Sequence, residues 1–259
     1  MNILTESLVE ETIQAVQEAG ACLSDPTALR CVRTKGETDY VTNVDLAVQE
    51  LLRERLAVLT PDIQFMGEEQ DNSRLDWHRP CWILDPVDGT TNLIHDFNHS
   101  AISLALVEHG KPIMGVVYNP FTNQMYTAVE GQGAFLNGSP IHVSQNKRLA
   151  DSLISIGTSP GNRSNPTAVF TRMQRFFEHC QDVRRNGAAS LDLCYVACGK
   201  LDGYFEENLK PWDYAAGMLL VQEAGGKITD GHGDPLVFRP EREISATNGW
   251  ISDEFLQLV

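Results

Sequence analysis

The stretch 82–92, with the sequence WILDPVDGTTN, constrains this chain more than any other. Its apolar first part is typical of a buried strand. Proline has no N–H for a central ladder, so we expect the strand to stop at Asp85 and the backbone to turn at Pro86, with Asp88 inside the turn. Gly89 permits a tight loop, and the residues after it are types that begin helices. The pattern predicts a strand end that brings two carboxylates and the N–H groups of a new helix together.

The chemistry of such a turn is specific. Two neighbouring carboxylates, here Asp85 and Asp88, repel each other unless a proton or a cation lies between them. Mg²⁺ prefers oxygen ligands of this kind, and a helix N-terminus favours a phosphate. The combination indicates metal-assisted hydrolysis of a phosphate ester. Taken alone, the same residues also fit an acidic turn that only caps a helix.

Other motifs favour the first interpretation. Gly67-Glu68-Glu69 precedes the stretch 82–92, and Trp212-Asp213-Tyr214 and Glu223-Ala224-Gly225-Gly226 follow it. In this order and at this spacing, the motifs resemble the inositol monophosphatase family over nearly the whole chain. The resemblance implies a fold of mixed α+β and α/β character, the layered α-β-α-β-α sandwich of the inositol monophosphatase and fructose-1,6-bisphosphatase type.

The resemblance also implies roles for single residues. The implied metal site binds two or three Mg²⁺ through the carboxylates of Glu68, Asp85, Asp88 and Asp213 and the carbonyl of Val87. The implied catalytic residues are Glu68, Thr90 and Asp45, of which the last two orient the attacking water. The implied substrate contacts are Asp88, Gly89, Thr90, Gly187, Ala189, Glu206 and Asp213.

Structural explanations stay open beside these roles. Asp45 and Asp213 lie in the first turns of expected helices, where an acidic side chain complements the helix dipole without any metal. Gly187 and Ala189 also suit close helix packing. Lys35 matches a family lysine that helps to place a further metal, but the loop after it is one residue shorter here, and an exposed lysine explains it equally well.

The substrate is constrained less than the reaction. Relatives that act on nucleotide 3′-phosphates usually have Lys and Glu at the positions of Thr91 and Asn92. This difference favours inositol monophosphate as the substrate. The alternatives are fructose 1,6-bisphosphate, histidinol phosphate, a 3′-phosphoadenosine nucleotide, and a non-catalytic regulatory protein with the same fold. Inhibition by Li⁺ and a homodimer are further implications of the resemblance.

Composition limits the partners and the compartment. The 259 residues carry a net charge of −15, which disfavours nucleic acid and anionic membranes as partners. No run approaches the length of a membrane helix, and the acidic N-terminus does not match a signal peptide. The six cysteines then indicate reduced thiols, with Cys194 and Cys198 in core packing rather than at zinc. We expect a cytoplasmic protein that acts on a small phosphate monoester.

Periodicity predicts the order of the elements. Helices are expected at 3–20, from 42 or 43 to 56, at 167–179, from the 187–190 segment to 198, and at 212–224. Strands are expected at 63–66, 102–107, 113–118, 125–129, 153–156, 201–206 and 244–246. We predict an N-terminal α+β domain, 1–148, with an antiparallel sheet and the metal site. A C-terminal α/β domain, 149–259, would contribute substrate contacts and Asp213.

Overall fold

The computed structural model describes residues 3–24, 32–34, 40–160, 163–236, 238 and 242–259. Its helices are α1 Glu6–Ser24, α2 Asn43–Leu59, α3 Thr90–Ile94, α4 Pro166–His179, α5 Ala189–Ala197, α6 Pro211–Glu223 and α7 Ser252–Leu256, with a 3-10 turn, η1 Leu149–Asp151. Its strands are β1 Val32–Thr34, β2 Tyr40–Thr42, β3 Gln64–Gly67, β4 Cys81–Asp88, β5 Ala101–Glu108, β6 Lys111–Asn119, β7 Gln124–Val129, β8 Gly133–Leu136, β9 Ser139–Ile141, β10 Leu153–Ile156, β11 Asp182–Arg184, β12 Gly203–Leu209, β13 Lys227–Thr229 and β14 Arg242–Thr247.

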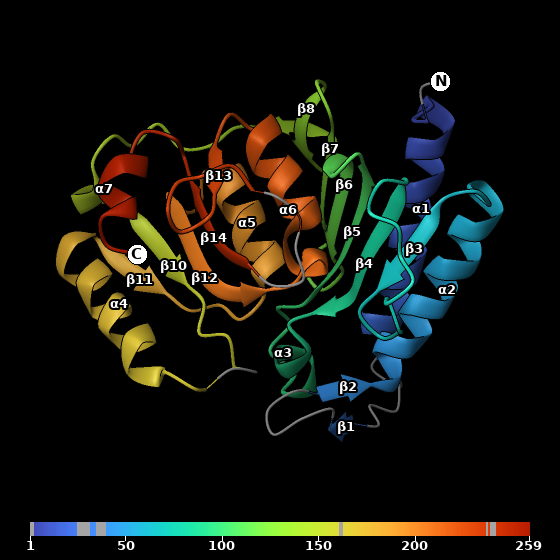
Figure 1. Ribbon diagram of the computed structural model, residues 1–259, viewed down its shortest axis with the longest axis horizontal. Coiled ribbons are helices and arrows are strands. Elements are labelled where there is room, and N and C mark those ends of the chain that lie inside the picture. Colours follow the sequence, from blue (N-terminus) through green and yellow to red (C-terminus); the bar gives the residue numbers. More distant parts are fainter. Residues whose placement is uncertain (1–2, 25–31, 35–39, 161–162, 237, 239–241) are drawn as a thin grey trace.

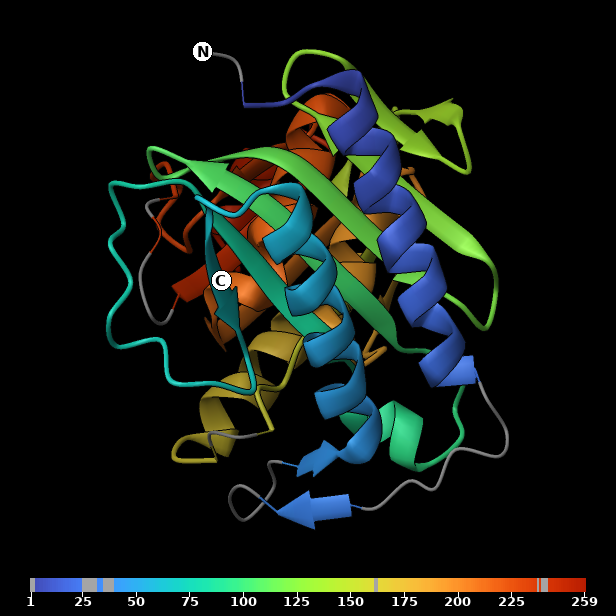
Figure 2. The same ribbon diagram turned by 90° about the vertical axis from the view of Figure 1, so that its right-hand side faces the viewer.

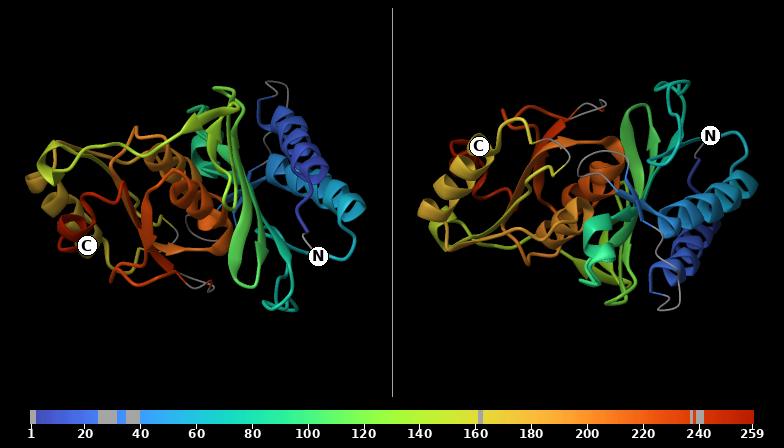
Figure 3. Two further views of the ribbon diagram at one scale, coloured as in Figure 1. Left: turned by 90° about the horizontal axis from the view of Figure 1, so that it is seen from above. Right: turned by 90° about the horizontal axis from the view of Figure 1, so that it is seen from below.

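These elements stack in five layers, α-β-α-β-α, as the family resemblance implied (Figures 1 and 3). Helices α1 and α2 lie side by side on the outer face of a seven-stranded sheet (Figure 2). Helices α5 and α6 fill the middle layer, and α4 and α7 cover the far face of a five-stranded sheet. Each interface between layers is apolar, so burial of apolar side chains stabilises the stacking.

The seven-stranded sheet has the order β3-β4-β5-β6-β7-β8-β9. Its neighbours pair antiparallel, as predicted, except β3 and β4, which run parallel with Gly67 opposite Leu84. Because parallel strands end at the same edge of a sheet, Glu68 and Asp85, the next residue on each chain segment, emerge beside each other. This pairing brings two of the predicted metal ligands together.

Strand β4 does not stop at Asp85, so the predicted turn at Pro86 is wrong. The ladder pairs Asp85 with Ser103 and Asp88 with Ala101, which leaves one extra residue in β4. Such a bulge leaves a residue unpaired, and it is one of the places where a strand tolerates proline. The strand therefore continues through the bulge and ends at Asp88, immediately before α3.

The five-stranded sheet has the order β11-β10-β12-β14-β13. Strands β11, β10 and β12 run parallel, and β14 pairs antiparallel with β12 and β13. Helix α6 packs against the first sheet so closely that a Cβ on Gly115 of β6 would lie 2.8 Å from the Ala216 carbonyl oxygen. The middle layer thus joins the two halves, and the domain boundary at residue 148 stays a prediction.

Helix α1 runs past Gly20, where the sequence predicted its end. A Cβ at this position would lie 2.4 Å from Cε1 of Tyr118 on β6. Gly20 therefore permits close packing of the helix on the sheet and does not terminate the helix.

Two further expectations concern the environment of the chain. Within the described residues, no helix combines the length and the apolar character that a membrane crossing requires. The described cysteines, Cys22, Cys81, Cys180, Cys194 and Cys198, are all free thiols. Cys31 and Lys35 lie outside the described residues.

Candidate active site

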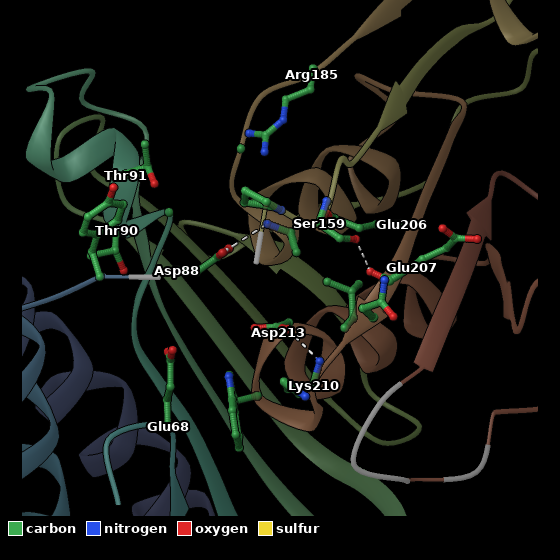
Figure 4. A pocket seen from close by; sticks show the side chains of 18 residues that line it. Glu68, Asp88, Thr90, Thr91, Ser159, Arg185, Glu206, Glu207, Lys210 and Asp213 are labelled. Carbon is green, nitrogen blue, oxygen red and sulfur yellow. Dashed lines mark hydrogen bonds between the residues drawn. The ribbon is translucent and has the colours of Figure 1, made fainter. Parts of the chain in front are cut away.

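A cavity of about 510 Å³ opens where the end of β4, helix α3 and the N-terminal ends of α5 and α6 meet (Figure 4). Eight of the predicted site residues line it, namely Glu68, Asp88, Gly89, Thr90, Gly187, Ala189, Glu206 and Asp213. The other three, Asp45, Asp85 and Val87, are buried. The fold thus brings residues from both halves of the chain to one place.

Asp85 is the most enclosed of the carboxylates at this edge of the sheet. Its side chain is only 3% exposed, and it accepts a hydrogen bond from the Val87 N–H at 3.0 Å. Burial, followed by the negative charges of Glu68 and Asp88, raises the pKa of Asp85 well above its usual range. A buried carboxylate among other carboxylates is stable only when a proton or a cation offsets the repulsion.

Gly89 and Thr90 form the turn that follows β4. Gly89 has a φ of +84°, and an added Cβ would lie 3.0 Å from the His99 carbonyl oxygen, so only glycine fits this left-handed position without strain. The hydroxyl of Thr90 donates to the Val87 carbonyl at 3.0 Å and lies 3.4 Å from Oδ1 of Asp45. The structure therefore brings together the pair that was predicted to orient water.

Asp45 is held by the first turn of α2. Its Oδ2 accepts from the backbone N–H of Thr42 at 2.8 Å and from the Thr42 hydroxyl at 2.5 Å, and Thr42 in turn caps the helix. This capping box is the structural explanation that the sequence left open. It occupies Oδ2 and leaves Oδ1 facing Thr90, so capping and a catalytic role are compatible.

Asp213 occupies the first turn of α6. Its Oδ2 accepts from the backbone N–H of Lys210 at 2.6 Å, as Figure 4 shows, and Pro211 begins the helix without needing a donor. Burial and the charge of Glu68 raise the pKa of Asp213 well above its usual range. The hydrogen bond fixes the carboxylate at the cavity wall opposite β3 and β4.

The donor set around this cavity fits Mg²⁺ in its chemistry. All the predicted ligands are oxygens, and the neighbouring charges raise the pKa values of Asp85 and Asp213. Among the described residues, no three His, Cys, Asp or Glu side chains already converge closely enough to hold a metal ion. The Asp88 carboxylate accepts from the N–H groups of Ala189 and Ser190 at the start of α5, which hold it at the cavity wall.

The charges on the cavity wall also indicate that the cavity binds a cation. Among the described residues, the carboxylates of Glu68, Asp88, Glu206, Glu207 and Asp213 line the cavity, beside the basic side chains of Arg185 and Lys210. An anionic phosphate is repelled by this excess of negative charge. Bound divalent cations would reverse the local sign of the charge.

Glu206 lies on the opposite wall, at the cavity end of β12 (Figure 4). Strand β12 continues to Leu209, so the prediction that it ends at Glu206 is wrong; the register with β14 shifts after Glu206. The carboxylate accepts from the Tyr204 hydroxyl at 2.6 Å and from the Ser159 N–H at 2.8 Å. It is therefore fixed while still lining the cavity.

Gly187 and Ala189 lie just before and at the start of α5. Gly187 has a φ of +87°, and its carbonyl accepts from the side-chain amide of Asn92 at 3.3 Å. The same amide donates to the carbonyls of His99 and Asn186. Asn92 therefore ties the Gly89–Thr90 turn to the segment that was predicted to contact substrate.

Sequence reasoning missed several residues on the cavity wall, including Tyr40, Ser159, Arg185 and Lys210. Arg185 is two residues before Gly187, and Lys210 is three before Asp213, so a search for basic residues beside the recognised motifs could have found both. Ser159 and Tyr40 carry no such signal.

Comparison with known proteins identifies the family of this chain. The model of the inositol monophosphatase family matches residues 4–258. The inositol-1-monophosphatase of Rhizobium meliloti (strain 1021) is 41% identical over 236 residues, which are 89% of this chain and 88% of that protein. A Xylella fastidiosa protein named Nus factor SuhB is 42% identical over 202 residues, 77% and 72% of the two chains. The crystal structure of the extragenic suppressor protein suhB from Bartonella henselae has a TM-score of 0.90 at 34% identity and covers 98% of each chain.

Proposed function

This chain belongs to the inositol monophosphatase family, and we propose that it hydrolyses inositol monophosphate to inositol and phosphate with Mg²⁺ as cofactor. The family is one of phosphatases that are generally metal-dependent. One observation carries the proposal for this chain: carboxylates that follow β3, end β4 and begin α6 line one cavity beside the Gly89–Thr90 turn.

The proposed metal ligands divide into two sets. Glu68, Asp85 and the Val87 carbonyl would hold one Mg²⁺, and Asp85, Asp88 and Asp213 would hold another. The family resemblance implies that a third could bind near Glu68. When bound, the ions would neutralise the carboxylates, lower the pKa of water and stabilise negative charge on the leaving oxygen. Asp85, which both sets share, is more buried than Asp88, at 3% against 7% exposed.

In the proposed reaction, Thr90 and Asp45 orient the attacking water. The water donates a hydrogen bond to Oγ1 of Thr90, whose own proton turns from the Val87 carbonyl to Oδ1 of Asp45. As the water oxygen bonds to phosphorus, its proton follows this path to Asp45. The N–H groups of Gly89 and Thr90 bind phosphate oxygens, and the alcohol departs and takes a proton from solvent.

The far wall of the cavity would bind the polyol. Glu206, held by two donors, would accept a hydrogen bond from a ring hydroxyl, and Gly187 and Ala189 would contact the ring through backbone atoms. Asp88, Gly89, Thr90 and Asp213 would contact the phosphate end. A fixed carboxylate costs little additional ordering when substrate binds, so its contribution to specificity is large.

Two other functions have a specific observation in their favour. Arg185 and Lys210 line the cavity and could bind a second phosphate, which favours fructose 1,6-bisphosphate as the second candidate substrate. The relative named Nus factor SuhB favours a regulatory role for the same fold. A homodimer in the cytoplasm remains a prediction.

The test is phosphate release, with and without Mg²⁺, from inositol 1-phosphate, fructose 1,6-bisphosphate, adenosine 3′,5′-bisphosphate and histidinol phosphate. We expect Mg²⁺-dependent release, fastest from inositol 1-phosphate. Preference for another compound would replace the substrate and keep the mechanism. Absence of release from all four, with Mg²⁺ still bound, would support the regulatory role.

A further inference from the structure

Helix α5 begins without a capping side chain of its own. Its N-cap position is Ala188, which makes no side-chain hydrogen bond to the helix. The cap comes instead from Asp88 at the end of β4 (Figure 4). Oδ1 of Asp88 accepts from the Ala189 N–H at 3.1 Å, and Oδ2 accepts from the Ser190 N–H at 2.7 Å and from the Ser190 hydroxyl at 2.5 Å.

We infer that Ser190 is a positioning residue for Asp88, whose carboxylate its hydroxyl locks in one orientation so that Oδ1 is presented to the metal. The inference rests on the proposed function, in which Asp88 is a metal ligand. A carboxylate oxygen accepts about two hydrogen bonds. Among the described residues, Ser190 fills both positions on Oδ2, whereas Ala189 fills one of the two positions on Oδ1.

The hydroxyl contributes what the backbone alone does not. The two N–H donors each bind a different oxygen of Asp88, and the Ser190 hydroxyl adds a second, shorter hydrogen bond to Oδ2. The Ser190 side chain is fully buried, so no water can replace its hydroxyl without rearrangement. Groups that orient a metal ligand in this way typically change metal affinity 10- to 100-fold when they are removed.

A purely structural role makes a different prediction. If the hydroxyl only stabilised the start of α5, its loss would lower the melting temperature and leave the metal affinity unchanged. The two backbone donors to Asp88 remain in Ser190→Ala, so the helix keeps its cap and the variant is expected to fold.

The experiment is calorimetric titration of Mg²⁺ into the metal-stripped full chain. We expect Ser190→Ala to raise the Kd for Mg²⁺ about 10-fold and Ser190→Thr, which keeps the hydroxyl, to restore it to within about threefold of wild type. Ser152→Ala is the matched control, because it also removes a fully buried serine hydroxyl, one that donates to the Arg148 carbonyl. Its Kd should equal that of wild type.

Each outcome decides one statement. An unchanged Kd in Ser190→Ala, with wild type binding Mg²⁺, overturns the positioning role and leaves the proposed function standing. An equal rise in Ser152→Ala and Ser190→Ala also overturns it, because the effect is then one of general stability. A wild type that binds no Mg²⁺ overturns the metal site itself and the positioning role with it.

Discussion

Gly157 makes room for the carboxylate that is proposed to bind the polyol, so Gly157→Ala tests that role directly. An ideal Cβ at residue 157 would lie 1.9 Å from Cδ and 2.0 Å from Oε2 of Glu206. No side chain tolerates such contacts, and Glu206 must rotate away. Its hydrogen bonds from the Tyr204 hydroxyl and the Ser159 N–H would then be lost.

The size of the effect follows from those contacts. A hydrogen bond to a charged group contributes about 1.5–3 kcal/mol. Loss of one such bond between Glu206 and a substrate hydroxyl lowers kcat/KM by roughly 10- to 150-fold. The two internal bonds to Glu206 add an expected loss of about 3 kcal/mol in the free energy of unfolding, because the displaced carboxylate regains water in the cavity.

The assay compares two substrates. Steady-state kinetics with inositol 1-phosphate should show the loss, whereas p-nitrophenyl phosphate, which has no ring hydroxyl, should react at nearly the wild-type rate. Glu206→Ala is the control, and Gly157→Ala added to it should have no further effect on kcat/KM, since both changes act through one carboxylate.

Two results would refute the reasoning. One is a kcat/KM for inositol 1-phosphate in Gly157→Ala within twofold of wild type. The other is an equal loss for both substrates, which would mean that the substitution damages the phosphate end of the cavity and not the recognition of hydroxyls.

Further predictions concern the phosphate end and the helix beside it. Asp85→Asn should abolish turnover yet raise the metal-free free energy of unfolding, because it removes a carboxylate whose pKa is raised by burial and by Glu68; wild-type turnover would contradict its place in the site. Thr90→Ala should lower kcat about 100-fold with little change in the Kd for Mg²⁺, measured by kinetics and calorimetry. Li⁺ should inhibit phosphate release in a dose-response assay. Burial raises the pKa of Asp192 from 3.8 to about 7. Its contribution to the free energy of unfolding is therefore fully present below about pH 4 and is lost as the pH rises through 7. The free energy of unfolding of Asp192→Asn, relative to that of wild type, should therefore rise by up to about 4 kcal/mol as the pH is raised from 4 to 8. Urea unfolding at several pH values measures this difference.

The layered fold was predicted through the family resemblance and not from periodicity, which cannot fix the order of layers. The carboxylates were expected to lie together because their motifs stand at the ends of elements. The continuation of β4 through Pro86 could not be predicted, because a bulge depends on pairing with the partner strand β5. The local sequence pattern contains no information on that pairing. The predicted helix end at Gly20 was wrong for the same reason. Gly20 packs against Tyr118, which is far away in the sequence.

The capping contacts between the halves were also beyond the sequence. Asp88 and Ser190 are 102 positions apart, and no periodicity relates them. Asn92 was recognised only as part of a motif, whereas the structure shows its amide joining the Gly89–Thr90 turn to Gly187. Long-range side-chain contacts of this kind require the fold before they can be inferred.

The central claim is that carboxylates from both halves form one essential Mg²⁺ site. Asp213→Asn tests it most directly, because Asp213 is the ligand proposed for α6. The measurement is phosphate release from inositol 1-phosphate by wild type and variant across a Mg²⁺ titration. The account predicts that release by wild type requires Mg²⁺ and that the variant releases none, or needs far more Mg²⁺. The same Mg²⁺ dependence and rate in both proteins would contradict it.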